Sequence, residues 1–474
     1  MQKSSGGKSA QRDLVSDRNG SDIINNKPER LLSLVFPYCI PTLGLEPSTL
    51  SERSAPLNIG SVCRRWRKNV LNNAALWSSF EIRAKKNTLE WLPALKLWLK
   101  RSGDSPLSFR IEFIYHHLDW DHLDDEENFD LDAFEDMDNS GAFYRCWKEI
   151  QAHQQRWKDV EITVKGMMET QACILSVKNA PLLENLNIFF HQLNQESPVT
   201  SINLATCPRL RTLKLRGAVK FALRGAILND LRELDIFRTD RASEISSVPD
   251  FHAFLRAAPN LETAKAVLVG YDPGAELAAL RLEHLHTLHV DIRTVEPSSK
   301  SKLFGSLTLP QLRSLRAQIG KSGRTGENNE DVLALIERAG GRVVDLELDG
   351  KGMRESEVKG CIRACPLLER LLLGTDLISS SLTKDLSSID ADGEFMFCPL
   401  LRTLEVSARI GSEPSARWQA ALEDLAVARW RGNRDGRRTF ASVKLSIFEK
   451  IANPRPELQK CVSEGLQVKI EKPE

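Results

Sequence analysis

One short apolar pattern, L-x-x-L-x-L, recurs through most of the chain. The closest copies are CPRLRTLKL from Cys207, CPLLERLLL from Cys365 and CPLLRTLEV from Cys398. The interval between copies is irregular, roughly 21 to 33 residues, and a recurrence of this length is typical of solenoid architectures. The first apolar residues of the ten copies are Trp157, Leu183, Leu210, Leu231, Leu261, Leu285, Leu312, Val343, Leu368 and Leu401.

Each copy predicts one strand of a repeated unit. The last two apolar positions alternate with polar ones as in a strand, while the first anchors the preceding turn. Amphipathic stretches at 250–258 and 331–339 predict helices between strands, and Gly340-Gly341 predicts the end of the second helix. The sequence thus predicts an α/β solenoid over residues 81–414, with a parallel sheet on the concave side and helices on the convex side.

A different pattern precedes the repeats. Leu32, Val35, Phe36 and Cys39 have helical spacing, and so do Ile59, Val62, Trp66 and Val70. Ser54 and Pro56 favour the start of the second helix, Asn72-Asn73 its end, and Phe80 and Ile82 a strand. Residues 27–80 are therefore expected to form a small helical module.

The segment from about Pro28 to Trp77 resembles the F-box in the form common among fungal F-box proteins. The family's first helix is matched by Pro28, Glu29, Leu31, Leu32, Val35 and Phe36. Its V-C-R-x-W and L-W parts are matched by Val62, Cys63, Arg64 and Trp66, and by Leu76 and Trp77. Lys27 stands where the family usually has Leu, and the loop 42–55 is longer than usual.

The repeats resemble the leucine-rich repeats that often follow an F-box. This resemblance implies a substrate-recognition subunit of a Skp-cullin-F-box ubiquitin ligase, which performs no catalysis itself. Its partners would be a Skp-type adaptor, a cullin scaffold reached through that adaptor, and a protein substrate. The implied adaptor-binding residues are Pro28, Leu31, Leu32, Val35, Phe36, Val62, Cys63, Leu76 and Trp77.

The open alternative is a leucine-rich-repeat scaffold unconnected with a ligase, in which a degenerate F-box only caps the repeats. In both cases a partner is expected on the concave face, because solenoids bind along such surfaces. The outward positions beside the last strand leucines provide the candidate substrate-binding residues, which are Lys214, Arg216, Phe237, His289, Arg316, Glu347, Asp349 and Glu405.

Composition narrows the class of partner. The 65 basic and 64 acidic residues nearly cancel, so we expect no general attraction to nucleic acid or membrane. Residues 1–26 are polar, lack the apolar core of a signal peptide and predict a disordered lead. The nine cysteines, scattered and odd in number, indicate reduced thiols. We expect an intracellular protein that is cytoplasmic, with a nuclear location as the open alternative.

Two further segments have their own character. The acidic stretch 119–138 predicts a solvated loop, with an interaction segment for basic partners as the alternative; the spacing of a calcium loop is absent. Residues 415–474 predict two helices and a strand, interpreted as a terminal cap, and Cys207, Cys365 and Cys398 predict buried thiols at packed corners.

The sequence contains no candidate catalytic motif. No G-x-S-x-G, H-E-x-x-H or G-x-G-x-x-G motif occurs, and Cys361 with Cys365 lacks a second pair of zinc ligands. The His/Asp group at 116–122 is better interpreted as a surface loop than as a metal site. We therefore expect no enzyme activity, no cofactor and no metal.

Overall fold

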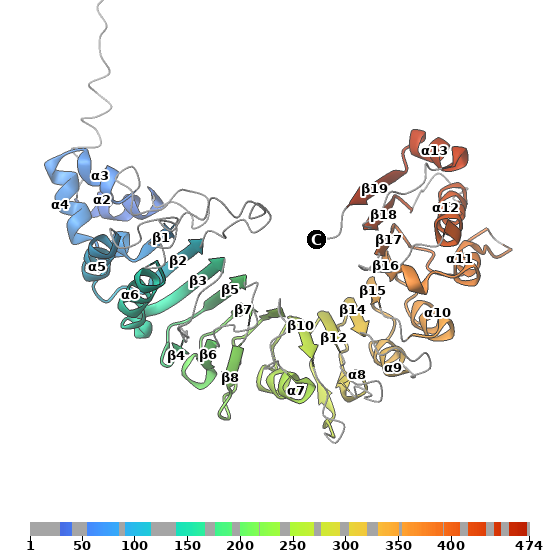
Figure 1. Ribbon diagram of the computed structural model, residues 1–474, viewed down its shortest axis with the longest axis horizontal. Coiled ribbons are helices and arrows are strands. Elements are labelled where there is room, and N and C mark those ends of the chain that lie inside the picture. The colour runs from blue at the N-terminus through green and yellow to red at the C-terminus, as the bar shows by residue number, and fades with distance from the viewer. Residues whose placement is uncertain are drawn as a thin grey trace, which may run out of the picture. The chain divides into compact units, whose positions relative to one another are not determined.

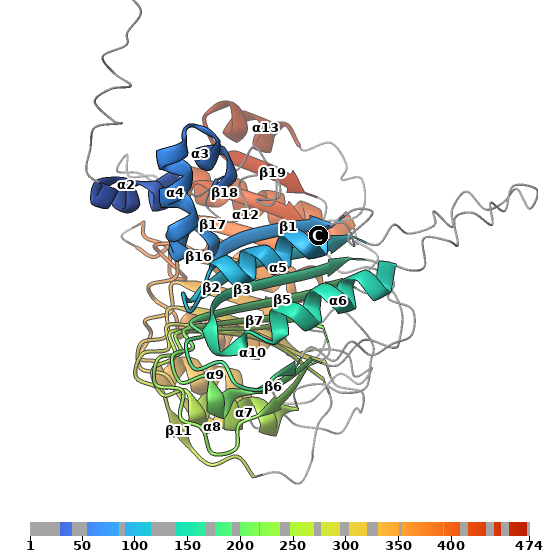
Figure 2. The same ribbon diagram turned by 90° about the vertical axis from the view of Figure 1, so that its left-hand side faces the viewer.

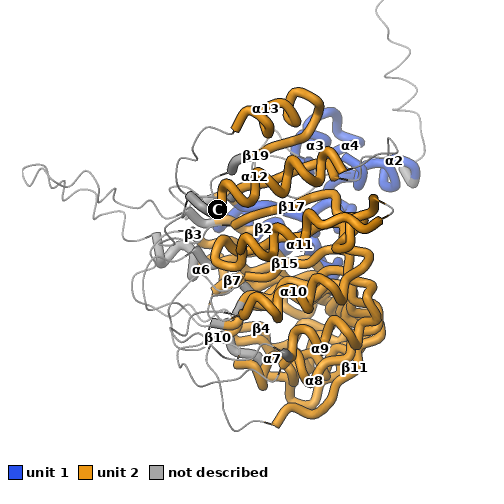
Figure 3. Tube along the Cα trace, turned by 90° about the vertical axis from the view of Figure 1, so that its right-hand side faces the viewer, with its two compact units in different colours: residues 1–82, 90–109 blue, residues 83–89, 110–474 orange. Residues whose placement is uncertain are grey.

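The computed structural model describes a large part of the chain. The described residues are 29–39, 55–84, 91–114, 139–165, 176–191, 200–217, 219–237, 247–269, 276–293, 303–319, 330–349, 353–391, 393–407, 416–432, 440–446 and 455–471. The predicted lead 1–26, the acidic stretch 119–138 and the group at 116–122 lie outside them. Two compact units are present: unit 1 is residues 1–82 and 90–109, and unit 2 is residues 83–89 and 110–474 (Figure 3). The first unit therefore extends beyond the predicted boundary at residue 80.

Unit 1 is mainly helical and is built around aromatic side chains. The indole rings of Trp77 and Trp98 pack edge to face, with 4.7 Å between their centroids. Nε1 of Trp77 donates a hydrogen bond to the carbonyl oxygen of Val70 at 2.8 Å. The rings of Phe36 and Trp66 also pack together, with 5.0 Å between their centroids. The helical elements of unit 1 are α2 (Glu29–Val35), η1 (Phe36–Cys39), α3 (Leu57–Ser61), α4 (Arg64–Asn72), η2 (Ala74–Trp77) and α5 (Leu92–Arg101).

The prediction of one continuous helix through Ile59 and Val70 is wrong. The chain leaves the helix after Val62, and Cys63 has extended backbone angles, φ −158° and ψ 169°. The Cys63 sulfur accepts from the amide of Trp66 at 3.4 Å, as an N-cap side chain does. Because α4 restarts at this cap, Val62 stands at a corner, with 59% of its surface exposed.

A sheet of fourteen strands dominates the rest of the described chain (Figures 1 and 2). Its order is β1-β2-β3-β5-β7-β9-β10-β12-β14-β15-β16-β17-β18-β19, and every pair from β3 to β19 is parallel. The strands are β1 (Ser79–Ala84), β2 (Leu107–Ile114), β3 (Trp157–Lys165), β5 (Asn185–His191), β7 (Thr212–Arg216), β9 (Glu233–Phe237), β10 (Thr263–Val269), β12 (Thr287–Arg293), β14 (Ser314–Ile319), β15 (Asp345–Asp349), β16 (Arg370–Gly374), β17 (Thr403–Ser407), β18 (Ser442–Ser446) and β19 (Gln467–Glu471).

Short strands form two smaller sheets beside the large one. The first has the order β4-β6-β8 and the second pairs β11 with β13. Their strands are β4 (Ser176–Val177), β6 (Thr200–Asn203), β8 (Val219–Ala222), β11 (Leu280–Arg281) and β13 (Leu307–Thr308).

The ten predicted anchor residues all lie in the core. Each is at most 1% exposed, from Trp157 to Leu401, and each begins a strand or stands shortly before one. The thiols of Cys207, Cys365 and Cys398 are also buried, as predicted. The following apolar positions are aligned from strand to strand, for example Leu315 with Leu346 and Leu346 with Leu371. The pattern L-x-x-L-x-L therefore specifies both the depth and the register of each strand.

Helices lie on one face of the sheet in unit 2. Figures 1 and 3 show α9 to α13 side by side on this face. The predicted stop after α9 is confirmed, because Gly340 and Gly341 have φ +67° and +69°. The helices of unit 2 are α6 (Asn139–Gln151), η6 (Gln154–Arg156), η7 (Leu204–Thr206), α7 (Val248–Ala257), α8 (Leu303–Ser306), α9 (Glu330–Arg338), α10 (Glu355–Arg363), η8 (Thr375–Leu377), α11 (Ser380–Ser387), α12 (Ala416–Arg431) and α13 (Pro456–Ser463).

The C-terminal segment continues the sheet. It contains the predicted helices, as α12 and α13, and the predicted strand, as β18. The sequence analysis missed β19, which pairs in parallel with β18, as β18 does with β17. This segment thus adds two more strands to the same sheet, and its role as a terminal cap stays a prediction. Within the described part of the chain, no helix is long and apolar enough to cross a membrane.

Candidate binding surfaces

The sheet of unit 2 has a second face, which we call the open face. No helix of the described residues covers it (Figure 1). Since side chains alternate along a strand, the aligned leucines point to the helices, and the residues between them form rows across the open face. One such row, in strand order from β10 to β17, is Lys265, His289, Arg316, Glu347, Leu372 and Glu405.

All eight residues predicted for the concave face belong to rows of the open face. Lys214 and Arg216 lie on β7, and the register pairs Arg216 with Phe237 of β9, whose side chain is outside the described set. The other five are on β12 to β17, namely His289, Arg316, Glu347, Asp349 and Glu405. Their common placement follows from the alternation, while their role in binding stays a prediction.

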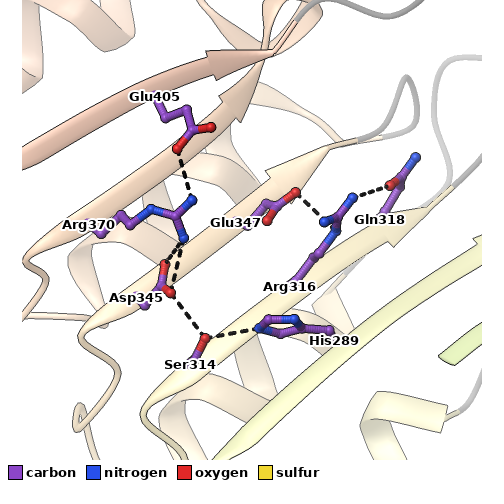
Figure 4. A network of polar contacts seen from close by, with 8 residues as sticks. All are labelled: His289, Ser314, Arg316, Gln318, Asp345, Glu347, Arg370 and Glu405. Carbon is purple, nitrogen blue, oxygen red and sulfur yellow. Dashed lines mark hydrogen bonds and ion pairs between the residues drawn. The ribbon is translucent and has the colours of Figure 1, made fainter. Parts of the chain in front are cut away.

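Arg370 connects two carboxylates on neighbouring strands (Figure 4). Its Nη1 donates to both oxygens of Asp345, at 3.1 Å each, and its Nη2 donates to Oε2 of Glu405 at 2.8 Å. The sequence analysis missed Arg370 and Asp345, although both precede a core leucine by one position, where alternation assigns a residue to this face. These hydrogen bonds fix the spacing of β15, β16 and β17 at their N-terminal ends.

A polar chain continues from Asp345 toward β12. The Ser314 hydroxyl donates to Oδ2 of Asp345 at 3.2 Å and lies 3.0 Å from Nε2 of His289. A nucleophilic triad requires the histidine between the hydroxyl and the carboxylate, so that the imidazole removes the proton. Here the serine stands between the two, and the arrangement positions the imidazole without activating the hydroxyl.

Burial sets the protonation states of two groups in this network. It lowers the pKa of His289 to about 4, with Lys265 and Arg316 contributing, so the imidazole is neutral at pH 7. It raises the pKa of Glu347 to about 7, against the opposing effect of Arg316. Arg316 also donates from Nη2 to Gln318 Oε1 at 3.3 Å (Figure 4).

On the open face of β7 to β10, carboxylates partly neutralise the charges of the basic side chains. Lys214 lies 2.8 Å from Glu233, and the guanidinium of Arg216 stands over the Phe189 ring at 5.1 Å. Burial raises the pKa of Asp235, while the positive charges of Lys265, Arg216 and Lys214 act to lower it. Carboxylates therefore compensate the basic side chains on this part of the open face.

The second candidate surface is on unit 1, where the structure divides the predicted adaptor-binding residues into two groups. Leu32, Phe36, Leu76 and Trp77 are at most 4% exposed and form the core of the unit. In this structure they are inaccessible to a partner, which corrects their assignment as contact residues. Leu31, Val35 and Val62 are 45%, 56% and 59% exposed, Cys63 is half-buried, and Pro28 lies outside the described residues.

Unit 1 also exposes apolar residues that the sequence analysis left out. Leu34 is 66% exposed, Tyr38 90% and Leu71 42%. Leu34 stands between the matched residues Leu32 and Val35 of α2, and this position was the available signal for it, while Tyr38 lies in η1 and Leu71 near the end of α4. Exposed basic side chains accompany them on α4, at Arg64, Arg67 and Lys68. These exposed apolar and basic side chains are the candidates for contact with a partner on unit 1.

Among the described residues, no group of three or more His, Cys, Asp or Glu side chains is arranged to hold a metal ion. Comparison with known proteins yields no matching family model and no similar curated protein.

Proposed function

We propose that this protein is the substrate-recognition subunit of a Skp-cullin-F-box ubiquitin ligase. In this proposal residues of unit 1 bind the Skp-type adaptor, and unit 2 is a leucine-rich-repeat solenoid whose open face holds the protein substrate. The chain positions the substrate, while other subunits perform ubiquitin transfer. Such a protein works inside the cell, in the cytoplasm or the nucleus.

The exposed apolar side chains of unit 1 carry this proposal. Leu31, Val35 and Val62 match apolar positions of the F-box and are each about half exposed. Complete burial of a leucine or valine is worth about 1.5–3 kcal/mol, so each of these half-exposed side chains gains about half of that when a partner covers it. Leu34 and Tyr38, beside them in sequence, would add to the same apolar contact.

The test is a pull-down of the purified chain with the Skp-type adaptor of the same cell. Val35→Asp and Val62→Asp should abolish binding, because each places a charge in the apolar contact. Ile227→Asp is the matched control, since Ile227 is 68% exposed and lies in unit 2. Circular dichroism should show all three variants folded. Undiminished binding by the Val35 and Val62 variants would refute the proposed contact.

A scaffold without ligase function is the second candidate. It is favoured by the burial of Leu32, Phe36, Leu76 and Trp77, since these matched positions also serve folding alone. Lys27, where the family usually has Leu, points the same way. In that case the wild-type chain fails to bind the adaptor, and its function depends on the open face.

A further inference from the structure

Positive charge collects at the start of α4 in unit 1. Four of its first five residues are basic, and the helix contains no acidic residue. The side chains of Arg64, Arg67 and Lys68 are exposed, and that of Arg65 is half-buried. Among the described residues, no carboxylate forms an ion pair with Arg64 or Lys68. The start of α4 therefore concentrates positive charge on a chain that is nearly neutral as a whole.

This distribution of charge lowers the stability of α4. The unpaired amides at a helix N-terminus carry a partial positive charge, so cations in the first turn are repelled. Arg64 and Lys68 stand four positions apart on one side of the helix, where like charges also repel each other. A sequence that breaks a local rule in this way is typical of a functional surface. The same charges become favourable when an anionic group approaches them.

The exposed cations form one stripe along α4. We call Arg64, Arg67 and Lys68 the basic stripe, since positions separated by three and four residues share one face of a helix. Val70, on another side of α4, is buried within the unit. Nε of Arg67 donates a hydrogen bond to the carbonyl oxygen of Gly60 at 3.0 Å. This bond fixes one cation of the stripe beside α3.

Apolar side chains border the basic stripe. Leu71 follows Lys68 on the same face of α4, and Val62 stands at the corner before the helix; both are about half exposed. Helix α2 lies against α4, where Nδ2 of Asn73 donates to the carbonyl oxygen of Ser33 at 3.2 Å (Figure 2). The exposed large side chains of α2 and η1 recur at helical spacing, and they are Leu31, Leu34, Val35 and Tyr38. Unit 1 therefore presents apolar and cationic surfaces on neighbouring helices.

This combination restricts the chemistry of a partner. A purely apolar partner would cover α2 but would bury the cations of α4 without compensation, which is costly. A basic partner would be repelled by the same cations. Carboxylates beside an apolar patch match both helices, and their hydrogen bonds to guanidinium and ammonium groups are charge-assisted.

We propose that the basic stripe binds carboxylate side chains of the Skp-type adaptor, which lie beside the apolar patch that covers α2. The inference rests on the function proposed above and adds the chemistry of the partner's surface. An anionic membrane also offers negative charge next to apolar groups. The near-neutral charge of the whole chain gives no general attraction to such a membrane, which favours the protein partner.

The test measures the association and dissociation rates of the full chain and the purified adaptor by surface plasmon resonance, at about 50 and about 500 mM NaCl. Complementary charges mainly accelerate association, so the association rate of the wild type should fall roughly tenfold between these salt concentrations. The double variant Arg64→Glu, Lys68→Glu should associate roughly tenfold more slowly at low salt and lose most of the salt dependence.

Lys100→Glu is the matched control for the single variant Arg64→Glu, because it makes the same change of charge at an exposed position of unit 1 on α5, outside the basic stripe. It should associate like the wild type. Arg64→Glu alone should slow association, by less than the double variant does.

Thermal unfolding separates a binding role from a structural one. Arg64→Glu places a carboxylate at the first residue of α4 and four positions before Lys68, so the melting temperature should stay the same or rise. Slower association by a variant of undiminished stability would identify the stripe as a contact. An association rate of the wild type that is independent of salt, or a double variant that associates like the wild type, would overturn the proposal.

The outcomes distinguish this proposal from the proposed function. Adaptor binding that is abolished by Val35→Asp but unaffected by the double variant would keep the function and overturn the basic contact. No adaptor binding by the wild-type chain at either salt concentration would overturn both. Vesicles of phosphatidylserine and phosphatidylcholine test the membrane. If the double variant loses vesicle binding that the wild type has, while its association with the adaptor is unchanged, the stripe is a membrane contact and the proposal is overturned.

Discussion

Arg316 lies 3.0 Å from Glu347, measured from Nε to Oε1, and yet the pKa of this carboxyl is raised to about 7. The Glu347 side chain is only 12% exposed, while that of Arg316 is 44% exposed. Solvent weakens the attraction of the exposed cation, and burial penalises the anion fully. The ion pair therefore leaves Glu347 only about half ionised at neutral pH.

Glu347 should make the folded protein less stable as the pH rises. Its folded pKa of about 7 exceeds the ordinary value of 4.5, so the folded state binds the proton more tightly. The stabilising contribution of the protonated Glu347 to the free energy of unfolding is fully present below pH 4.5 and is lost as the pH rises through 7. Glu347→Gln should remove this loss, on the order of 2 kcal/mol. Urea unfolding at pH 5, 6, 7 and 8 measures it, and parallel curves for wild type and variant would contradict it.

His289 should have the opposite dependence. Its folded pKa of about 4 lies below the ordinary 6.5, so the unfolded state binds the proton more tightly. Stability from the neutral imidazole is present above pH 6.5 and lost as the pH falls through 4. His289→Gln should reduce the acid sensitivity by on the order of 2 kcal/mol, measured by urea unfolding between pH 7 and 4. His284→Gln changes a histidine at an exposed position and serves as the control. Its loss of stability between pH 7 and 4 should equal that of the wild type.

The repeats were predictable because one physical constraint recurs. A residue such as Leu231 must anchor its turn wherever a new strand begins, and all ten anchors identified from the pattern are buried. The same alternation assigned the eight candidate residues to one face. Arg370 and Asp345 escaped notice because the choice was limited to positions beside the last strand leucine. Both stand one row earlier on the open face, where Arg370 contacts Asp345 of its own row and Glu405 of the next.

Unit 1 was less predictable for a local reason. Helical spacing from Ile59 to Val70 is compatible with one helix or with two shorter helices separated by a cap. The outcome depends on whether the Cys63 sulfur accepts from Trp66, a single contact that apolar periodicity does not encode. Burial of Trp77 depends similarly on partners distant in sequence, such as Trp98.

Two adjacent glycines after α9 allow a matched comparison. Both have positive φ, but a Cβ at Gly340 would meet nothing within 4 Å, whereas one at Gly341 would lie 3.2 Å from Cδ of Pro366. Gly340→Ala should lower the free energy of unfolding by about 1 kcal/mol, because of backbone strain alone. Gly341→Ala should lower it by at least about 2 kcal/mol, because the close contact with Pro366 adds to the same strain. Thermal unfolding of both variants measures the difference. Equal losses would show that the Pro366 contact relaxes freely.

Arg429 should be among the most sensitive side chains of the C-terminal region. It is 1% exposed, and its guanidinium donates to the carbonyls of Leu386, Phe397 and Cys398. Arg429→Met would leave these buried acceptors without their donor, and should lower the free energy of unfolding by about 3 kcal/mol. Arg429→Lys should restore little, since an ammonium cannot reproduce the planar arrangement of donors.

The control for Arg429 is Arg402→Met, because the Arg402 side chain is 64% exposed and its ion pair with Glu369 is a surface one. This substitution should change the free energy of unfolding by no more than about 0.5 kcal/mol. Similar losses in the two variants, measured by urea unfolding, would show that the carbonyl contacts of Arg429 add no stability.

The alternation of strand residues separates two kinds of evolutionary change. Substitutions in the aligned leucine rows disturb packing between a strand and its helices, so few are tolerated. Substitutions in the open-face rows, such as those of Lys265 and Glu405, alter one position in a linear series of side chains and leave the leucine rows intact. A lineage of such proteins could therefore acquire new partners one strand at a time, keeping the same core throughout.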